Sequence, residues 1–207
     1  MENGNSNRII ATIEVQKYLV KVDPIMGAVI DRHGAIDYEL RTNYLNALLS
    51  NIIGQQLSGK VADVIWGRVV GLVGGEITAE KILALDDESL RSAGLSRNKA
   101  AYIKNIARAV SDGSLALDNF CDMRDTAIMT QLTAIKGIGE WTAEMFLIFS
   151  LGRIDVFSKG DGGLARANNL YCDGTEMTAK KRLAVTEAWK PYRSIASLYL
   201  WRSLDNR

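Results

Sequence analysis

The chain has 207 residues, 47% of them hydrophobic, and a formal net charge of +1. With two cysteines and one histidine, it lacks the residues for a four-cysteine iron–sulfur cluster or a zinc site built on histidines. No apolar stretch is long enough to span a bilayer and the N-terminus does not resemble a signal peptide, so we expect a cytoplasmic protein in which Cys121 and Cys172 are free thiols.

Apolar residues recur at spacings of three and four along most of the chain, which is typical of amphipathic helices. Ile9, Ile13, Tyr18 and Leu19 suit a first helix. Later helices are expected over residues 45–53, 61–72, 98–110, 126–135, 141–150, 163–170, 179–189 and 194–204. Two short helices should begin after Thr78 and Asp86, which suit N-caps. The pattern therefore predicts an all-α fold.

The sharpest local signal is residues 132–143, which read Leu-Thr-Ala-Ile-Lys-Gly-Ile-Gly-Glu-Trp-Thr-Ala. Two helices flank a hairpin in which Ile138 should point inward between Gly137 and Gly139. Glycines allow a tight turn and a close approach of the backbone to another molecule, and the N-terminus of the second helix suits a phosphate oxygen. The alternative is a plain tight turn between two helices.

Asp161 stands just before a predicted helix, in the segment Lys-Gly-Asp-Gly-Gly-Leu. Aspartate at this place is commonly a helix cap. A carboxylate at a helix N-terminus also stays ionised at neutral pH, which is the state that stabilises a positively charged sugar. The two roles are compatible.

Aromatic residues are usually part of the core, and we expect this of Trp66 and Trp189. Trp141 is different because it follows the hairpin by two residues and should face whatever the hairpin binds.

The hairpin, followed by residues 155–157 (Asp-Val-Phe) and then Asp161, resembles the helix-hairpin-helix–Gly/Pro–Asp superfamily of DNA glycosylases, and within it the 3-methyladenine DNA glycosylase II branch. Three further segments are similar to that branch. They are residues 53–58 (Ile-Gly-Gln-Gln-Leu-Ser), 139–143 (Gly-Glu-Trp-Thr-Ala) and 189–194 (Trp-Lys-Pro-Tyr-Arg-Ser). The similarity covers roughly residues 40–205, and the order and spacing of the motifs are specific as a set.

The resemblance implies roles for individual residues. Asp161 matches the catalytic aspartate, and no cofactor is expected apart from a structural Na⁺ or K⁺ at the hairpin. That cation would be held by the backbone carbonyls of Thr133, Ile135 and Ile138. The base pocket is expected to contain Trp141, Trp201 and Met145. Residues expected to contact DNA are Gln55, Gln56, Ser58, Gly137, Ile138, Gly139 and Thr142, with the loop at Gln55 and Gln56 filling the gap left by a flipped nucleotide.

The sequence also departs from the family pattern. Gln56 stands where some relatives have an apolar wedge, so insertion into the duplex would be polar. Gly160 replaces an acidic residue that often precedes the catalytic aspartate, and Gly162 and Gly163 should loosen the pocket floor.

The resemblance implies two helical lobes with a cleft between them that holds Asp161, Trp141 and Trp201. One lobe is expected over residues 44–153, with the hairpin, and the other over 1–43 and 154–207. The expected function is a monomeric, monofunctional DNA glycosylase that removes alkylated purines from double-stranded DNA, associated with the nucleoid if the source is bacterial. A glycosylase for a neutral lesion (uracil, hypoxanthine or an oxidised purine) and a non-catalytic helix-hairpin-helix DNA-binding module remain the alternatives.

Overall fold

The computed structural model describes residues 7–167, 170 and 178–204; Cys172 and the predicted helical positions 168–169 lie outside them. The chain divides into two compact units. We call Arg41–Phe146 the central unit, and Met1–Leu40 with Leu147–Arg207 the terminal unit. The sequence-based boundaries, 44 and 153, lie a few residues later. The boundary between Phe146 and Leu147 falls inside a helix, and the regular spacing of apolar residues within a helix does not show where one unit ends and the next begins.

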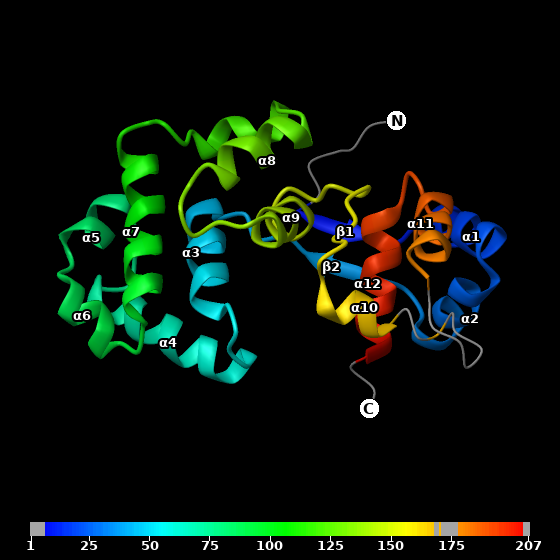
Figure 1. Cartoon of the computed structure of the whole chain (residues 1–207), viewed down its shortest axis with the longest axis horizontal. Coiled ribbons are helices and arrows are strands. Elements are labelled where there is room, and N and C mark those ends of the chain that lie inside the picture. The colour runs from blue at the N-terminus through cyan, green and yellow to red at the C-terminus, as the bar shows by residue number, and fades with distance from the viewer. Residues whose placement is uncertain (1–6, 168–169, 171–177, 205–207) are drawn as a thin grey trace. The chain divides into compact units, whose positions relative to one another are not determined.

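The central unit is helical in its described elements (Figure 1). They are α3 (Tyr44–Gly54), α4 (Gly59–Leu72), α5 (Ala79–Ala84), α6 (Asp87–Ser92), α7 (Arg97–Ser111), the 3₁₀ helix η1 (Leu117–Asp122), α8 (Asp125–Thr133) and the first part of α9 (Glu140–Phe149). Helix α3 packs on α4 and α7, and α7 also packs on α5 and α6. The core of the central unit includes Leu48, Leu49 and Ile52 of α3 and Ile103 and Ile106 of α7, all 0% exposed.

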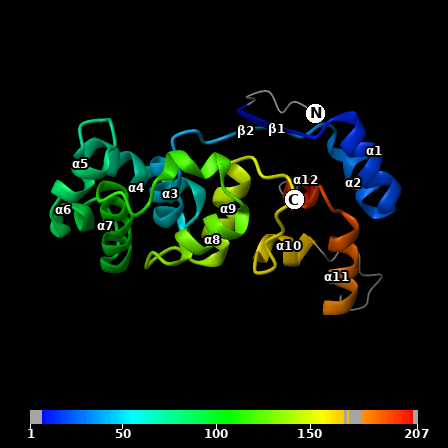
Figure 2. The same ribbon diagram turned by 90° about the horizontal axis from the view of Figure 1, so that it is seen from above.

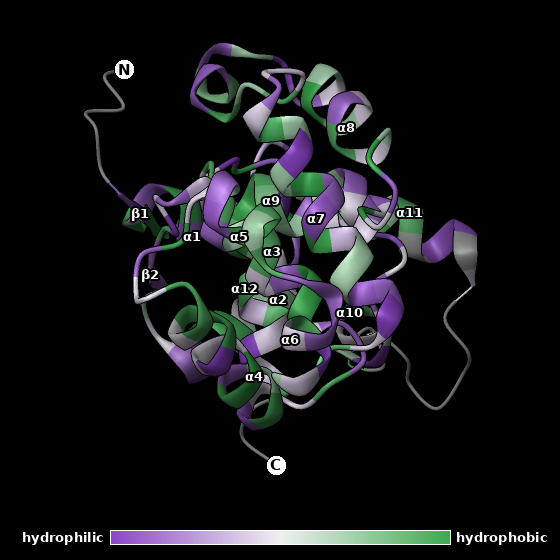
Figure 3. Ribbon diagram, turned by 90° about the vertical axis from the view of Figure 1, so that its left-hand side faces the viewer, coloured by the Kyte–Doolittle hydropathy of each residue, from purple (hydrophilic) through white to green (hydrophobic). Residues whose placement is uncertain are grey.

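Most of α3 and α9 carry hydrophobic colour in Figure 3. Apolar residues on several sides of a helix are expected where neighbours surround it. The predicted N-caps of the two short helices are confirmed. The side chains of Thr78 and Asp86 accept hydrogen bonds from the N–H groups of Lys81 (3.3 Å) and Ser89 (2.6 Å).

The terminal unit combines helices with a small antiparallel ribbon (Figures 1 and 2). Its elements are β1 (Arg8–Ile10), α1 (Ile13–Val22), α2 (Pro24–His33), β2 (Asp37–Glu39), the end of α9, α10 (Gly162–Ala167), α11 (Ala179–Ala188) and α12 (Arg193–Leu204). Helix α12 packs on α2 and α10, and α1 packs on α2. The predicted core position of Trp189 is confirmed, since it is 0% exposed and its indole N–H donates to Asp23 Oδ2 at 2.7 Å.

Three elements of the fold differ from the prediction: the β ribbon and α2 in the terminal unit, and η1 in the central unit. Ile9 was assigned to a helix but lies in β1, opposite Tyr38 of β2, because strands of three residues are too short to show an alternating pattern. Helix α2 was overlooked, although Asp23 caps it and Pro24 opens it, which are recognised helix-start signals. The short 3₁₀ helix η1 was not predicted either.

None of the helices within the described ranges is long and apolar enough to cross a membrane. The same residues contain no group of three or more His, Cys, Asp or Glu side chains placed to bind a metal ion.

Candidate active site and nucleic-acid interface

The predicted hairpin lies in the central unit, between α8 and α9. Ile138 at its centre is 4% exposed, and its N–H donates to the carbonyl of Ile135 at 3.0 Å. Leu132, at the end of α8, is fully buried. The inward orientation predicted for Ile138 is confirmed, and this side chain anchors the turn to the core.

The two hairpin glycines have different physical requirements. Gly137 has a φ of +115°, and a Cβ there would lie 2.4 Å from Cγ of Tyr102 on α7. Glycine at 137 is therefore needed by the tight turn itself, which is one of the two reasons expected from the sequence, and by the packing of Tyr102. Gly139 is exposed, and a Cβ there would meet no described atom within 4 Å. Only Gly139 leaves its Cα face open to a ligand.

Of the expected cation ligands, Thr133 is the last residue of α8, and Ile135 and Ile138 lie in the turn that joins α8 to α9. The carbonyl of Thr133 belongs to the last turn of α8, where helical carbonyls lack partners within the helix. The carbonyl of Ile135 accepts one N–H and keeps a second lone pair. Carbonyl oxygens are ligands that Na⁺ and K⁺ take in proteins, so these oxygens are of a suitable type, and a cation at the hairpin stays a prediction.

The loop after α3 is bonded to the hairpin through Gln55. The Gln55 side-chain amide donates to the carbonyl of Gly137 at 3.4 Å and to the hydroxyl of Thr142 at 3.2 Å. Thr142 is only 2% exposed, so its side chain contacts Gln55 and is hidden from solvent. Gln56, next in the chain, is exposed and has a φ of +59°, which is uncommon for a residue other than glycine. Ser58 is exposed and makes no capping hydrogen bond to α4.

Lys99 holds the same loop from the side of α7. Its ammonium donates to the carbonyls of Ile53 (2.7 Å) and Gln55 (2.6 Å), which end α3. A cation is favourable at a helix C-terminus because the helix dipole is negative there. Burial lowers the pKa of Lys99. Gln55 and Lys99 together fix the backbone that presents Gln56. Lys99 is not recognisable from the sequence as part of the site, because a lysine in the first turn of a helix has no distinctive local pattern.

Trp141 is 41% exposed and lines a pocket of about 540 Å³ within the central unit. Trp66 of α4 also lines this pocket and is half-buried, so the expectation that Trp66 belongs to the core is wrong. Asp63 lies three positions before Trp66, on the same face of α4, and completes this side of the pocket. Met145 is buried at 6% exposed and is not one of the described residues that line the pocket.

Asp161 lies in the terminal unit, directly before α10, and is 8% exposed. Its Oδ1 accepts the N–H of Leu164 at 2.7 Å, which confirms the predicted helix cap. The same oxygen accepts the indole N–H of Trp201 at 2.9 Å. Both donors stabilise a negative charge on the carboxylate. A buried carboxylate next to an aromatic ring is therefore present in one unit of the protein.

Trp201 is the end of a row of aromatic rings. Its ring centroid lies 5.6 Å from that of Phe149, which lies 5.1 Å from that of Tyr38. The row borders a pocket of about 280 Å³ whose lining residues are Ile36, Tyr38, Phe149, Leu198, Trp201 and Arg202. Arg202 donates to the carbonyls of His33 (3.3 Å) and Ala35 (2.8 Å), and these bonds hold its side chain in place at the edge of the pocket.

Gly163 does not loosen the site, contrary to expectation. A Cβ at this position would lie 2.9 Å from Asp161 Oδ1 and 3.0 Å from Cδ1 of Trp201. The missing side chain is what allows the indole to reach the carboxylate.

The structure thus brings together two sets of predicted site residues. Asp161 and Trp201 are bonded in the terminal unit, and Gln55, Gly137 and Thr142 are bonded in the central unit. That Trp141 serves the same substrate as Asp161 stays a prediction.

Comparison with known proteins identifies relatives. A family described as HhH-GPD superfamily base excision DNA repair protein matches residues 49–193. The DNA-3-methyladenine glycosylase of Saccharomyces cerevisiae is 31% identical over 173 residues, which are 79% of this chain and 58% of the yeast protein. The chain spans about two thirds or less of the length of the first curated relatives that it matches.

Two solved structures are similar over nearly the whole chain. A DNA-3-methyladenine glycosidase from Bacillus halodurans has a TM-score of 0.85 and 39% identity, covering 96% of this chain and 93% of that one. The 3-methyladenine DNA glycosylase Mag1 of Schizosaccharomyces pombe, solved in complex with abasic DNA, has a TM-score of 0.82 and 28% identity, covering 93% and 97%. The fold class expected from the sequence is confirmed by these likenesses.

Proposed function

This chain belongs to the HhH-GPD superfamily of base excision DNA repair proteins, and on that basis we propose that it is a monofunctional DNA glycosylase that removes alkylated purines of the 3-methyladenine kind. The observation that carries the proposal is the Asp161 carboxylate, buried at a helix start and bonded to the indole of Trp201. Relatives from yeasts and bacilli that bear the name of this activity support it.

The first step that we propose is extrusion of the damaged nucleotide from the duplex, which costs a few kcal/mol. The open backbone at Gly139 lets the hairpin amides bind a phosphate, and this contact reads no sequence. The exposed Gln56 fills the space that the base leaves. Its backbone is already fixed by Gln55 and Lys99, so little ordering is needed when DNA binds.

A base alkylated on a ring nitrogen carries a positive charge. Tryptophan faces attract such a cation by about 0.5–2 kcal/mol each, depending on desolvation. Trp201, next to the carboxylate, and Trp141, next to the hairpin, are the residues we assign to this contact. The charge also makes the base a good leaving group, so the reaction needs no strong general acid.

In the chemical step the bond between the sugar C1′ and the base nitrogen breaks, and its electron pair leaves with the base. The sugar becomes an oxocarbenium-like cation, which the Asp161 carboxylate stabilises electrostatically. Water then adds to C1′ and loses a proton, which leaves an intact strand with an abasic site.

The proposal is tested by base release from duplexes that carry 3-methyladenine, 7-methylguanine, hypoxanthine, uracil or 8-oxoguanine. We expect release of the two methylated purines, because only these are cationic, and little release of the other three. Preferential release of a neutral lesion would favour the alternative glycosylase. Duplex binding without any release would favour a DNA-binding module.

We expect no strand cleavage, because strand-cutting relatives place a lysine where this chain has Trp141, and that lysine forms a Schiff base with the sugar. Trp141→Lys should not create an efficient lyase, because a reactive lysine needs a lowered pKa and a sugar at attack distance. The variant should mainly lose contact with the base. Borohydride trapping on abasic DNA, with wild type and variant in parallel, measures this.

Trapping of the wild-type protein would contradict the monofunctional assignment, since it requires an amine in reach of the sugar. Trapping of Trp141→Lys alone would show that the site already has the geometry of a strand-cutting enzyme. Cleavage of the abasic strand only after heating in alkali is the result that agrees with hydrolysis.

A further inference from the structure

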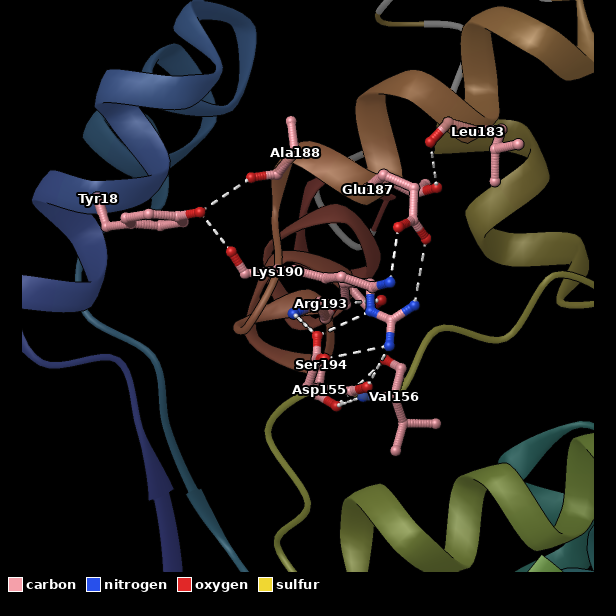
Figure 4. A network of polar contacts seen from close by, with 11 residues as sticks. Tyr18, Asp155, Val156, Leu183, Glu187, Ala188, Lys190, Arg193 and Ser194 are labelled. Atoms are coloured by element: carbon pink, nitrogen blue, oxygen red, sulfur yellow. Dashed lines mark hydrogen bonds and ion pairs between the residues drawn. The ribbon is translucent and has the colours of Figure 1, made fainter. Parts of the chain in front are cut away.

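The segment that leads into Asp161 is bonded to the first turn of α12 (Figure 4). Arg193 donates through Nε to Asp155 Oδ1 at 2.7 Å and through Nη2 to Oδ2 at 3.1 Å. The same Nη2 donates to the main-chain carbonyl of Asp155 at 2.8 Å. A guanidinium that binds both oxygens of a carboxylate and a neighbouring carbonyl fixes the direction of the chain as well as its distance.

Ser194 holds the next residue of the same segment. Its hydroxyl accepts the N–H of Val156 at 2.9 Å and donates to the carbonyl of Val156 at 3.2 Å. The N–H of Ser194 donates to the carbonyl of Ile154 at 3.0 Å. Ser194 is 0% exposed, so water does not compete for these bonds. The first two residues of α12 thus bind three successive residues, 154 to 156.

The other end of the segment is bonded to the same helix. Trp201, eight residues after Arg193, donates to Asp161. Eight residues of an α-helix span about 12 Å. Helix α12 therefore contacts the segment at two points a fixed distance apart, one at Asp155 and Val156 and one at Asp161.

We propose that Arg193 is a positioning residue for Asp161, and that its bonds to Asp155 set where the Asp161 carboxylate meets Trp201. This inference rests on the proposed function, because it assigns the positioning to base release. The motif at residues 189–194, which the mechanism does not otherwise use, then has a physical role. Arginine is required, since lysine offers a single ammonium and no planar pair of donors.

The outer side of Arg193 supplies a matched control. Glu187 lies 3.6 Å from Nη1 of Arg193 and 2.6 Å from the ammonium of Lys190, and its side chain is 46% exposed (Figure 4). Exposed ion pairs of this kind contribute little to structure. Glu187→Gln removes a charge from the same network without touching Asp155, so it should leave the site unchanged.

The test compares wild type, Arg193→Gln and Glu187→Gln by two measurements. The first is the indole N–H resonance of Trp201 in a ¹⁵N spectrum, assigned by its loss in Trp201→Phe. The second is the single-turnover rate of 7-methylguanine release, with affinity for an abasic duplex measured alongside. In Arg193→Gln we expect the Trp201 resonance to move and the rate to fall roughly 10- to 100-fold, as small misplacements do. Affinity should change less than about two-fold, because the hairpin contacts are intact.

A folded Arg193→Gln protein whose Trp201 resonance stays in place would overturn the proposal, as would a moved resonance with an unchanged rate. Equal effects in Glu187→Gln would assign them to the network as a whole and not to the Asp155 contact. If Arg193→Gln does not fold, Asp155→Asn repeats the test, because it keeps the shape and one acceptor oxygen. If wild type releases no base, the proposed function fails, and the resonance still decides whether Arg193 positions the contact.

Discussion

Asp161→Asn is expected to lower the rate of base release by about 100- to 1000-fold, the usual cost of losing an electrostatic stabiliser. The asparagine oxygen can still accept the N–H groups of Leu164 and Trp201, so the cap on α10 and the indole contact remain. What is lost is the negative charge that faces the sugar cation. Affinity for duplex DNA should stay the same or increase, because one negative charge is removed. Single-turnover release of 7-methylguanine and duplex binding at fixed salt measure the two effects.

Asp86→Asn is the matched control for this experiment. Asp86 caps α6 through the N–H of Ser89, in the same way that Asp161 caps α10. It lies in a different unit from Asp161 and is assigned no role in the reaction. The control should release base at the wild-type rate. If Asp161→Asn also stays within a few-fold of wild type, Asp161 is a helix cap and the catalytic assignment is wrong.

Gly137→Ala is expected to destabilise the protein strongly. An alanine at a φ of +115° is strained by about 1–3 kcal/mol. Its Cβ would also overlap the ring of Tyr102, and such overpacking typically costs a further ~1–3 kcal/mol. The free energy of unfolding should therefore fall by roughly 2–6 kcal/mol. Urea unfolding followed by circular dichroism measures this. A variant as stable as wild type would contradict the packing of Tyr102 on the hairpin.

Gly139→Ala separates DNA binding from stability, because the added methyl group meets no described atom within 4 Å. Its stability should match that of wild type. Affinity should fall about ten-fold or more for damaged and undamaged duplexes alike, since a hydrogen bond to a charged group contributes about 1.5–3 kcal/mol. A folded Gly139→Ala protein with wild-type affinity would contradict the binding of a phosphate by the hairpin.

The features that could be predicted from the amino-acid sequence depend on residues within about one helical turn of each other. The longer α-helices of the central unit follow from apolar spacing, and the caps at Thr78, Asp86 and Asp161 follow from residue type at a helix start. The hairpin with its inward Ile138 was predicted in the same way. These features form wherever the local chain can satisfy its own backbone groups, so a local pattern is sufficient to identify them.

Contacts between side chains that are distant in the sequence could not be predicted and are known only from the three-dimensional fold. Gly137 is required because Tyr102, 35 positions earlier, packs against it. Gln55 bonds to Thr142 across 87 positions, and Arg193 bonds to Asp155 across 38. Trp66 lines a pocket, although its residue type indicated the core. Contacts of this kind depend on the path of the whole backbone, and a short stretch of sequence contains no information on that path. The cap role of Asp161 could therefore be derived from its own segment, whereas its bond to Trp201 required the fold.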